Sequence, residues 1–274
     1  MNGDLGSDVP ASPEPLRGEP EGDILEPIAQ VPVTGPTLRD TAERLAKVVQ
    51  EGRVTMPDER PLLVCKPNRI ESWRIFKIMA EFVEGFDIIR RHGLAATFFG
   101  SARASLEDEV YQHATDLAAR LAKRGFAIIT GGSSGIMQAA NKGGFEAGGV
   151  SVGLNINLPQ VQRYNPYLTE RFGFDHFFVR KVMLTYASEA YVYFPGGFGT
   201  LDEFFEIVTL VQTKKIRKVP IILFGREYWT PLAQFIEKNA YEERKAIDKA
   251  DMELYHIVDT VDEAFEYIVA NVSC

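Results

Sequence analysis

The sequence predicts an α/β domain with a doubly wound parallel sheet. From Leu94 onward, short apolar runs alternate with helical patterns, and the apolar runs are nearly continuous. Strands of that kind are buried on both faces of a parallel sheet whose crossovers are helices. The chain has 274 residues, of which 45% are hydrophobic, so it can bury a full core. In such a fold the ligand is expected at the carboxyl ends of the strands.

Two segments are expected to precede this sheet. Residues 1–36 are rich in Pro, Gly and acids and contain no aromatic residue, which predicts a disordered or loosely attached tail. Residues 37–93 are predicted to form a helical extension, with one amphipathic helix from Thr37 to about Glu51 and a second that ends at Gly93. The second helix carries an apolar stripe that we interpret as core or subunit interface, formed by Trp73, Phe76, Ile78, Met79, Phe82, Val83 and Phe86.

The remaining residues, 94–274, are predicted to form one domain around the sheet. Its expected strands are 94–100, 126–132, 150–156, 175–179, 190–196, 219–225 and 255–258. Its expected helices are 105–125, 135–149, 180–188 and one that begins at Thr200, followed by a solvated helix from Tyr241 and a final amphipathic helix.

The composition disfavours several classes of protein. A formal net charge of −8 and a pI near 5.2 indicate no basic face for DNA or RNA. The two cysteines, Cys65 and Cys274, cannot form a disulfide framework or a CxxC site, and the four histidines are scattered, so no metal is expected. The N-terminus lacks a signal-like pattern, and no apolar run approaches roughly 18 residues. We therefore expect a cytoplasmic protein that does not bind a membrane.

Three expected strands end in loops of small residues. The loops read FFGSAR at 98–103, ITGGSSGIM at 129–137 and FPGGFGTLDE at 194–203. Glycine lets the backbone approach a ligand closely, and the N-terminus of the next helix offers free N–H groups. Together the loops predict a nucleotide-binding crevice in a Rossmann-like fold, although strand-to-helix turns also need glycine for structural reasons alone. The GxGxxG and GxxxxGK[ST] signatures are absent, which disfavours a nicotinamide enzyme and a P-loop ATPase.

The third loop combines a phosphate cradle with an acid. Its glycines and Thr200 can surround a phosphate with N–H groups and a hydroxyl at the start of a helix. Glu203 follows Thr200 by three residues, or about 5 Å along the helix axis, which is comparable to the distance from a 5′-phosphate to the far side of its ribose. The alternative is that Asp202 and Glu203 are ordinary acids of a first helical turn.

Arg180 and Lys181 form a basic pair directly after the expected strand 175–179. At a helix start, cations oppose the helix dipole. Their placement therefore indicates an anion to be bound, with an ordinary charged surface as the alternative.

These motifs resemble the LOG family. The resemblance rests on Arg180-Lys181, on PGGFGTLDE with its last acid 23 residues after the arginine, and on TGGSSGIMQAANKG and GLNINLP; it runs from about Leu94 to Trp229. Members of the family are nucleoside 5′-monophosphate phosphoribohydrolases, including cytokinin-activating enzymes, and many carry the label lysine decarboxylase. A pyridoxal phosphate decarboxylase needs a buried Schiff-base lysine, and no lysine of this sequence has an equally convincing setting.

The resemblance implies a role for each motif. Arg180 and Glu203 correspond to the catalytic arginine and glutamate of the family. The implied substrate-binding residues are Lys181, Gly196, Gly197, Phe198, Gly199, Thr200 and Thr209, with Gly100, Ser101, Gly131 and Gly132 near the nucleotide. A nucleoside 5′-monophosphate substrate, no cofactor, and a homodimer that can assemble into a hexamer are implied as well. Val161 and Gln162 stand where relatives often carry an acid, which leaves the preferred base open.

The expected reaction is hydrolysis of the N-glycosidic bond, which releases the free base and ribose 5-phosphate. Positive charge develops on the ribose, so a carboxylate at Glu203 can stabilise the transition state and orient water. Arg180 would position the substrate. The alternative from another class is a non-catalytic nucleotide sensor or a molybdenum-cofactor carrier on the same fold, and the presence of both residues favours the enzyme.

Overall fold

The computed structural model describes residues 39–40, 43–44, 46–47, 72–157 and 165–272. Contacts divide the chain into one unit of residues Met1–Pro67 and another of residues Asn68–Cys274. The described residues of the first unit are all helical, in agreement with the helix expected from Thr37 to Glu51. The tail expected over residues 1–36 lies outside the described residues, as do Cys65, Val161, Gln162 and Cys274.

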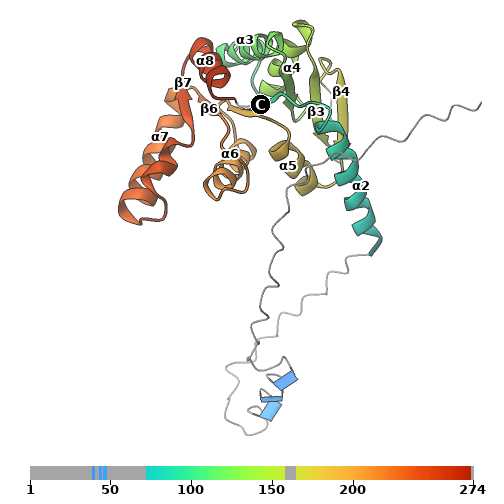
Figure 1. Cartoon of the computed structure of the whole chain (residues 1–274), viewed down its shortest axis with the longest axis vertical. Helices are drawn as coiled ribbons and strands as arrows, with labels where there is room; N and C mark the ends of the chain where they lie inside the picture. The colour runs from blue at the N-terminus through green and yellow to red at the C-terminus, as the bar shows by residue number, and fades with distance from the viewer. Residues whose placement is uncertain (1–38, 41–42, 45, 48–71, 158–164, 273–274) are drawn as a thin grey trace, which may run out of the picture. The chain divides into compact units, whose positions relative to one another are not determined.

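Among the described residues of the second unit, seven parallel strands form one sheet, which confirms the doubly wound α/β fold (Figure 1). The strand order is β4-β3-β2-β1-β5-β6-β7, and every neighbouring pair is parallel. The strands are β1 (Ala95–Phe99), β2 (Ala127–Thr130), β3 (Ser151–Ile156), β4 (Glu170–Phe174), β5 (Ala190–Tyr193), β6 (Ile221–Phe224) and β7 (His256–Val258).

Helices cover both faces of this sheet (Figure 1). One face carries α3 (Glu109–Lys123), α4 (Ile136–Glu146) and α8 (Val261–Asn271). The other carries α2 (Ser72–Ile89), α5 (Phe177–Tyr186), α6 (Phe198–Gln212) and α7 (Arg226–Ile236).

The segment between α7 and β7 differs from the expectation of a regular solvated helix from Tyr241. It contains a π-helical stretch, Glu237–Glu243, and a 3₁₀ stretch, Lys249–Glu253. Lys245 between them has a φ of 51°, a left-handed conformation that cannot continue a right-handed helix.

The core consists of two hydrophobic clusters, one on each face of the sheet. Strands β1, β2, β3, β5 and β6 are buried at every residue. Because successive side chains point to opposite faces, a single strand supplies both clusters. In β1, Ala95 and Phe99 pack with α2, α5 and α6, whereas Ala96 and Phe98 pack with α3, α4 and α8. This two-sided burial is the reason that the strands could be predicted as continuous apolar runs.

The strand expected at 175–179 is wrong. Residues from Phe177 onward begin α5, and the strand in this part of the sheet is β4. β4 lies at the sheet edge, where no strand of the described ranges pairs with its outer side and residues such as Arg171 are exposed, so it has no apolar run. Conversely, Phe177 and Phe178 are apolar but exposed on α5. Arg180 therefore lies one turn inside a helix rather than directly after a strand.

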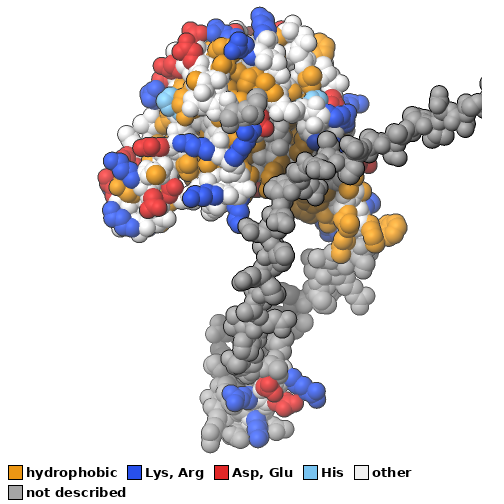
Figure 2. All heavy atoms as spheres, viewed as in Figure 1, with side chains coloured by type: hydrophobic (Ala, Val, Ile, Leu, Met, Phe, Trp, Pro, Cys, Tyr) orange, Lys and Arg blue, Asp and Glu red, His pale blue; other side chains and the backbone are white. Residues whose placement is uncertain are grey.

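The apolar stripe of α2 is only partly core. Ile78 and Phe82 pack against the cluster beneath α5 and α6. The other five stripe residues, Trp73, Phe76, Met79, Val83 and Phe86, are exposed. Figure 2 shows hydrophobic side chains gathered over the N-terminal end of α2. The interpretation of this stripe as a subunit interface, and with it the homo-oligomer, stays a prediction.

Within the described ranges, no helix is both long and apolar enough to span a membrane.

Candidate active site

The largest set of predicted site residues lies where the strand order reverses. β2 pairs with β1 on one side, and β5, which comes later in the chain, pairs with β1 on the other. The loops after β1 and β5 therefore diverge at the carboxyl ends of the strands, where this fold binds ligands. A cavity of about 790 Å³ lies there, lined by residues of all three glycine loops and by the first turns of α5 and α6. We call this cavity the crevice.

The loop after β5 is held from two sides. The Ser101 N–H donates to the Pro195 carbonyl over 3.0 Å. The Tyr228 hydroxyl donates to the Gly196 carbonyl over 2.7 Å. α6 begins at Phe198, which lines the crevice together with the two residues after it. Because the first N–H groups of a helix have no partner within it and lie at the positive end of its dipole, this loop is suited to an anion such as phosphate.

Arg180 brings a partly buried cation to the crevice. Its Nε–H donates to the Leu154 carbonyl of β3 over 2.9 Å. A Cβ built on Gly131 would lie 2.8 Å from Nη2 of Arg180, so the loop after β2 accommodates the guanidinium because a glycine stands there. The ring of Phe177 lies 5.5 Å from the guanidinium carbon. Burial lowers the pKa of Arg180 and Glu203 partly opposes this, and an arginine remains charged at neutral pH.

Glu203 is the buried acid of the crevice. The residue is 6% exposed, and its Oε2 atom has no hydrogen-bond partner among the described residues. Burial raises the pKa of Glu203 to about 7 against the opposing effect of Arg180, and Glu206 adds to the rise. The Tyr193 hydroxyl donates to the Glu203 backbone carbonyl over 3.1 Å, which fixes this turn of α6. A buried carboxyl with a perturbed pKa and an unpaired oxygen in a cavity is typical of a functional group.

The structure brings ten of the thirteen predicted site residues to the crevice. They are Gly100, Ser101, Gly131, Arg180, Gly196, Gly197, Phe198, Gly199, Thr200 and Glu203.

The other three predicted residues lie outside the crevice. The buried Gly132 does not line it. Lys181 does not line it, and its Nζ lies 2.8 Å from Asp202 Oδ2 and 3.3 Å from Glu206 Oε2. Thr209 is exposed beside a separate apolar cavity at α6 and α7. Substrate contacts of all thirteen residues stay predictions.

Several residues that line the crevice were not predicted. They are Phe99, Ala102, Arg103, Met137, Phe177, Pro195, Asp202 and Tyr228. Phe177 was hidden by the wrong strand at 175–179. Tyr228 follows β6, the neighbour of β5, so the rule that ligands bind at strand carboxyl ends could have found it if applied to that strand.

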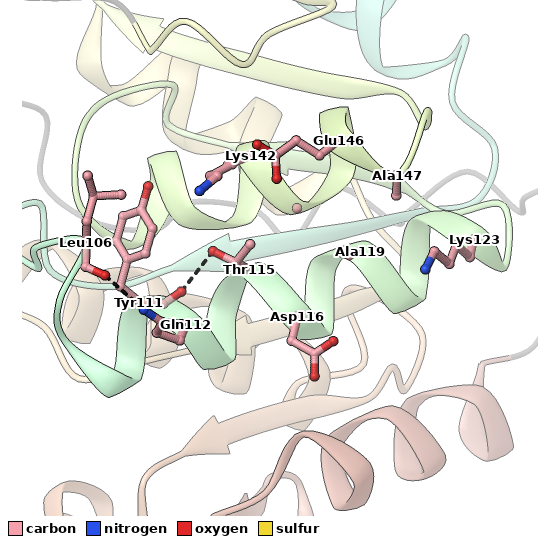
Figure 3. Close-up of a pocket in the computed structure, with 11 residues that line it drawn as sticks. Leu106, Tyr111, Gln112, Thr115, Asp116, Ala119, Lys123, Lys142, Glu146 and Ala147 are labelled. Atoms are coloured by element: carbon pink, nitrogen blue, oxygen red, sulfur yellow. Dashed lines mark hydrogen bonds between the residues drawn. The ribbon is translucent and has the colours of Figure 1, made fainter.

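A second cavity, of about 620 Å³, lies between α3 and α4, and we call it the α3–α4 cavity (Figure 3). Its lining residues belong to these two helices or adjoin them, and they include Asp116, Lys123, Lys142 and Glu146. The Tyr111 hydroxyl is buried there without a hydrogen-bond partner in the described part of the chain. Burial raises the pKa of Tyr111, so this group is neutral at ordinary pH. Leu106, from the loop after β1, also lines this cavity, but the loops after β2 and β5 do not.

The crevice thus combines three features within one cavity: a helix N-terminus suited to phosphate, a partly buried cation and a buried carboxyl group. A carboxylate in a low-dielectric site can stabilise positive charge that develops on a bound sugar. In the α3–α4 cavity Lys142 is partly buried as well, but both carboxyl groups, Asp116 and Glu146, are exposed.

Comparison with known families gives a match over part of this chain. A family model described as "Possible lysine decarboxylase" matches residues 137–268, which include Arg180 and Glu203.

Two named relatives also match this chain, each over about half of its length. The cytokinin riboside 5′-monophosphate phosphoribohydrolase of Rhodococcoides fascians is 27% identical over 153 residues, which cover 54% of this chain and 76% of that protein. The probable cytokinin riboside 5′-monophosphate phosphoribohydrolase LOG6 of Arabidopsis thaliana is 30% identical over 154 residues, which cover 53% of this chain and 73% of that protein.

A solved structure of the molybdenum cofactor carrier protein from Chlamydomonas reinhardtii has a TM-score of 0.50 at 21% identity, over 65% of this chain and 96% of that one. This likeness concerns the fold alone.

Proposed function

Because this chain belongs to the LOG family of cytokinin riboside 5′-monophosphate phosphoribohydrolases, we propose that it hydrolyses the N-glycosidic bond of a nucleoside 5′-monophosphate. The substrate is of the AMP or cytokinin riboside 5′-monophosphate type. The bond between ribose C1′ and the base nitrogen breaks, the oxygen of a water adds to C1′, and a proton passes to the departing base. The products are the free base and ribose 5-phosphate.

The observation that carries this proposal is the environment of Glu203. Its carboxyl group is buried in the crevice, has an unpaired oxygen, and lies one helical turn after the N-terminal residues of α6. A 5′-phosphate bound at the helix N-terminus would place the ribose over that turn. The carboxylate would then stabilise the positive charge that develops at C1′ and orient the attacking water.

The remaining crevice residues have complementary roles in the proposed reaction. The α6 N-terminus supplies binding energy at the phosphate, remote from the bond that breaks, and this energy can orient the ribose against Glu203. Arg180 is fixed by the Leu154 carbonyl and positions the substrate beside the acid. The exposed ring of Phe177 lines the same cavity and offers a face on which a base can stack.

The test is chromatographic measurement of free adenine after incubation of the purified full-length protein with AMP or adenosine. We expect adenine from AMP and at least about 10²-fold less from adenosine, because the nucleoside lacks the group that the α6 N-terminus binds. Equal rates with both would contradict the role of that helix. Binding of monophosphates without release of any base would favour the nucleotide sensor or cofactor carrier instead.

A further inference from the structure

Helix α2 lies outside the segment that matches the family model, yet it contacts the helix that carries Arg180. Glu81 of α2 is largely buried, with its side chain 12% exposed. Its Oε1 accepts from the Asp175 N–H over 3.0 Å and lies 3.0 Å from His176 Nδ1, and its Oε2 accepts from the His176 N–H over 3.2 Å. One carboxylate of α2 thus satisfies three polar groups at the start of α5.

α5 has no such group of its own. Its N-cap residue, His176, makes no side-chain capping bond, and its first turn contains no acidic residue. A carboxylate near a helix N-terminus satisfies free N–H groups and interacts favourably with the dipole. Glu81 therefore accepts from the N–H of the N-cap residue, as the acid of a capping box does, but it does so from another helix.

A second contact lies further along the same two helices. A Cβ built on Gly85 would lie 2.6 Å from Sδ of Met183, so α2 and α5 approach closely here only because residue 85 is glycine. The contacts at His176 and at Met183 fall on either side of Arg180 in the sequence of α5. The backbone of Arg180 is therefore fixed by α2 from both directions, while its side chain is held by the Leu154 carbonyl.

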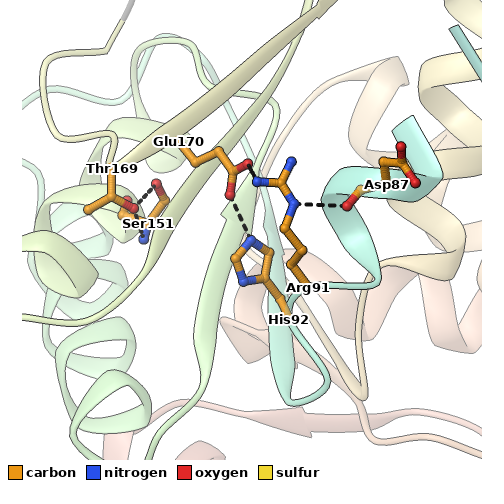
Figure 4. Close-up of polar contacts among 6 residues, drawn as sticks. All are labelled: Asp87, Arg91, His92, Ser151, Thr169 and Glu170. Carbon is orange, nitrogen blue, oxygen red and sulfur yellow. Dashed lines mark hydrogen bonds and ion pairs between the residues drawn. The ribbon is translucent and has the colours of Figure 1, made fainter. Parts of the chain in front are cut away.

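The C-terminal end of α2 has a different anchor. Glu170 of β4 contacts both His92 and Arg91 (Figure 4). Its Oε2 lies 2.9 Å from His92 Nε2, and its Oε1 lies 2.7 Å from Arg91 Nη1. Arg91 also donates through Nε to the Asp87 carbonyl over 2.9 Å. This cluster ties the end of α2 to β4 and does not involve the contacts of Glu81. A substitution of Glu170 therefore serves as a matched control, because it loosens α2 but leaves the Glu81 contacts in place.

We propose that Glu81 is a positioning residue for the reaction: its carboxylate holds Asp175 and His176, the two residues before α5, and thereby keeps the Arg180 guanidinium at the position the substrate requires. This inference rests on the proposed function. It makes α2 a part of the catalytic apparatus, although α2 does not line the crevice.

The experiment compares full-length variants for AMP hydrolysis and for thermal unfolding. Glu81→Ala should lower kcat by about tenfold and change KM by less than about threefold, because a small misplacement of a positioning group affects the transition state more than binding. Glu81→Gln keeps one acceptor oxygen where the carboxylate has two, so it can hold only one of the two backbone N–H groups and should lose less kcat than Glu81→Ala. Glu170→Ala should lower the Tm but leave kcat near that of the unmodified protein.

A double-mutant cycle separates positioning from a merely structural role. If Glu81 acts through Arg180, then Glu81→Ala should have no further effect on kcat in an Arg180→Ala background. Should Glu81→Ala fail to fold, Glu81→Asp replaces it, since the shorter acid keeps the charge but falls short of the Asp175 and His176 N–H groups; the same loss of kcat is expected.

Three outcomes would overturn the inference: normal kcat in a folded Glu81→Ala or Glu81→Asp variant, an equal loss of kcat in Glu170→Ala, or an undiminished effect of the Glu81 variant without Arg180. Failure of the proposed function would be distinct, because the unmodified protein itself would then release no base.

Discussion

The crevice and the α3–α4 cavity have comparable volumes, about 790 and 620 Å³, but their charges lie in different environments. In the α3–α4 cavity, Asp116, Lys123 and Glu146 are exposed. In the crevice, Glu203 is buried and the guanidinium of Arg180 has lost enough water for its pKa to fall. Water solvates the charges of the α3–α4 cavity, so they cost little free energy. Taking the charges of the crevice out of water costs free energy unless a bound ligand offsets it.

The difference teaches that volume and the number of charges are poor guides to a site in this molecule. A more useful sign is a charge that the fold buries at the carboxyl ends of the strands without pairing it internally. This comparison predicts which substitutions will matter and which will not.

The largest effect is expected from Glu203→Gln. The amide keeps the shape of the side chain but cannot stabilise positive charge on the ribose, so kcat for AMP should fall by about 10²-fold or more. KM should change much less, because the phosphate site at the α6 N-terminus remains intact. Initial rates of adenine release over a range of AMP concentrations measure both constants.

The matched control is Glu146→Gln in the α3–α4 cavity. It makes the same chemical change on an exposed carboxylate that lines a hollow of similar volume. Both kcat and KM should remain within about twofold of the unmodified protein. If Glu146→Gln lost as much turnover as Glu203→Gln, then burial of the carboxyl group would not distinguish the crevice from the α3–α4 cavity.

A second expected effect concerns stability. The folded protein raises the pKa of Glu203 from 4.5 to about 7. A raised pKa means that the folded state holds a proton that the unfolded chain has lost, so the unmodified protein loses stability as pH rises from about 4.5 to 7. The shift corresponds to about 3 kcal/mol, and Glu203→Gln avoids this loss.

Urea unfolding of both proteins between pH 5 and pH 8 measures this difference. The variant should gain stability relative to the unmodified protein as pH rises, and the gain should level off above about pH 7. Because all other titratable groups are shared, their contributions cancel in the comparison. A constant difference across this range would mean that Glu203 is well solvated, unlike the buried group described above.

Much of the fold could be predicted because buried parallel strands give continuous apolar runs. β1 and β5 show this clearly, since all their residues are buried. β4 could not be found in this way because it is an edge strand with mixed burial. The apolar start of α5 was mistaken for that strand, since exposed Phe177 and Phe178 resemble a buried run in a sequence.

The site was predictable to a similar extent. Glycines at strand ends, together with the resemblance to the LOG family, pointed to Glu203 and the loop after β5, and both line the crevice. Glu81 has no such pattern, because it reaches its partners through packing of elements far apart in the sequence. The sequence could suggest that α2 packs against something, but not that one of its acids meets the two residues before α5.

Apart from the Glu146→Gln control, the smallest effect is expected from Lys181→Ala, which tests the comparison within a single basic pair. Lys181 is adjacent to Arg180 in sequence, but its ammonium group pairs with Asp202 and Glu206, and the Asp202 side chain is 54% exposed. Because partly exposed ion pairs contribute little and are screened by salt, the variant should lose at most about 1 kcal/mol of stability. KM for AMP should change by less than about threefold. A tenfold rise in KM would mean instead that Lys181 leaves its carboxylate partners and binds the substrate, as the family resemblance implies. Burial of a charge would then not be enough to identify the functional residues of this site.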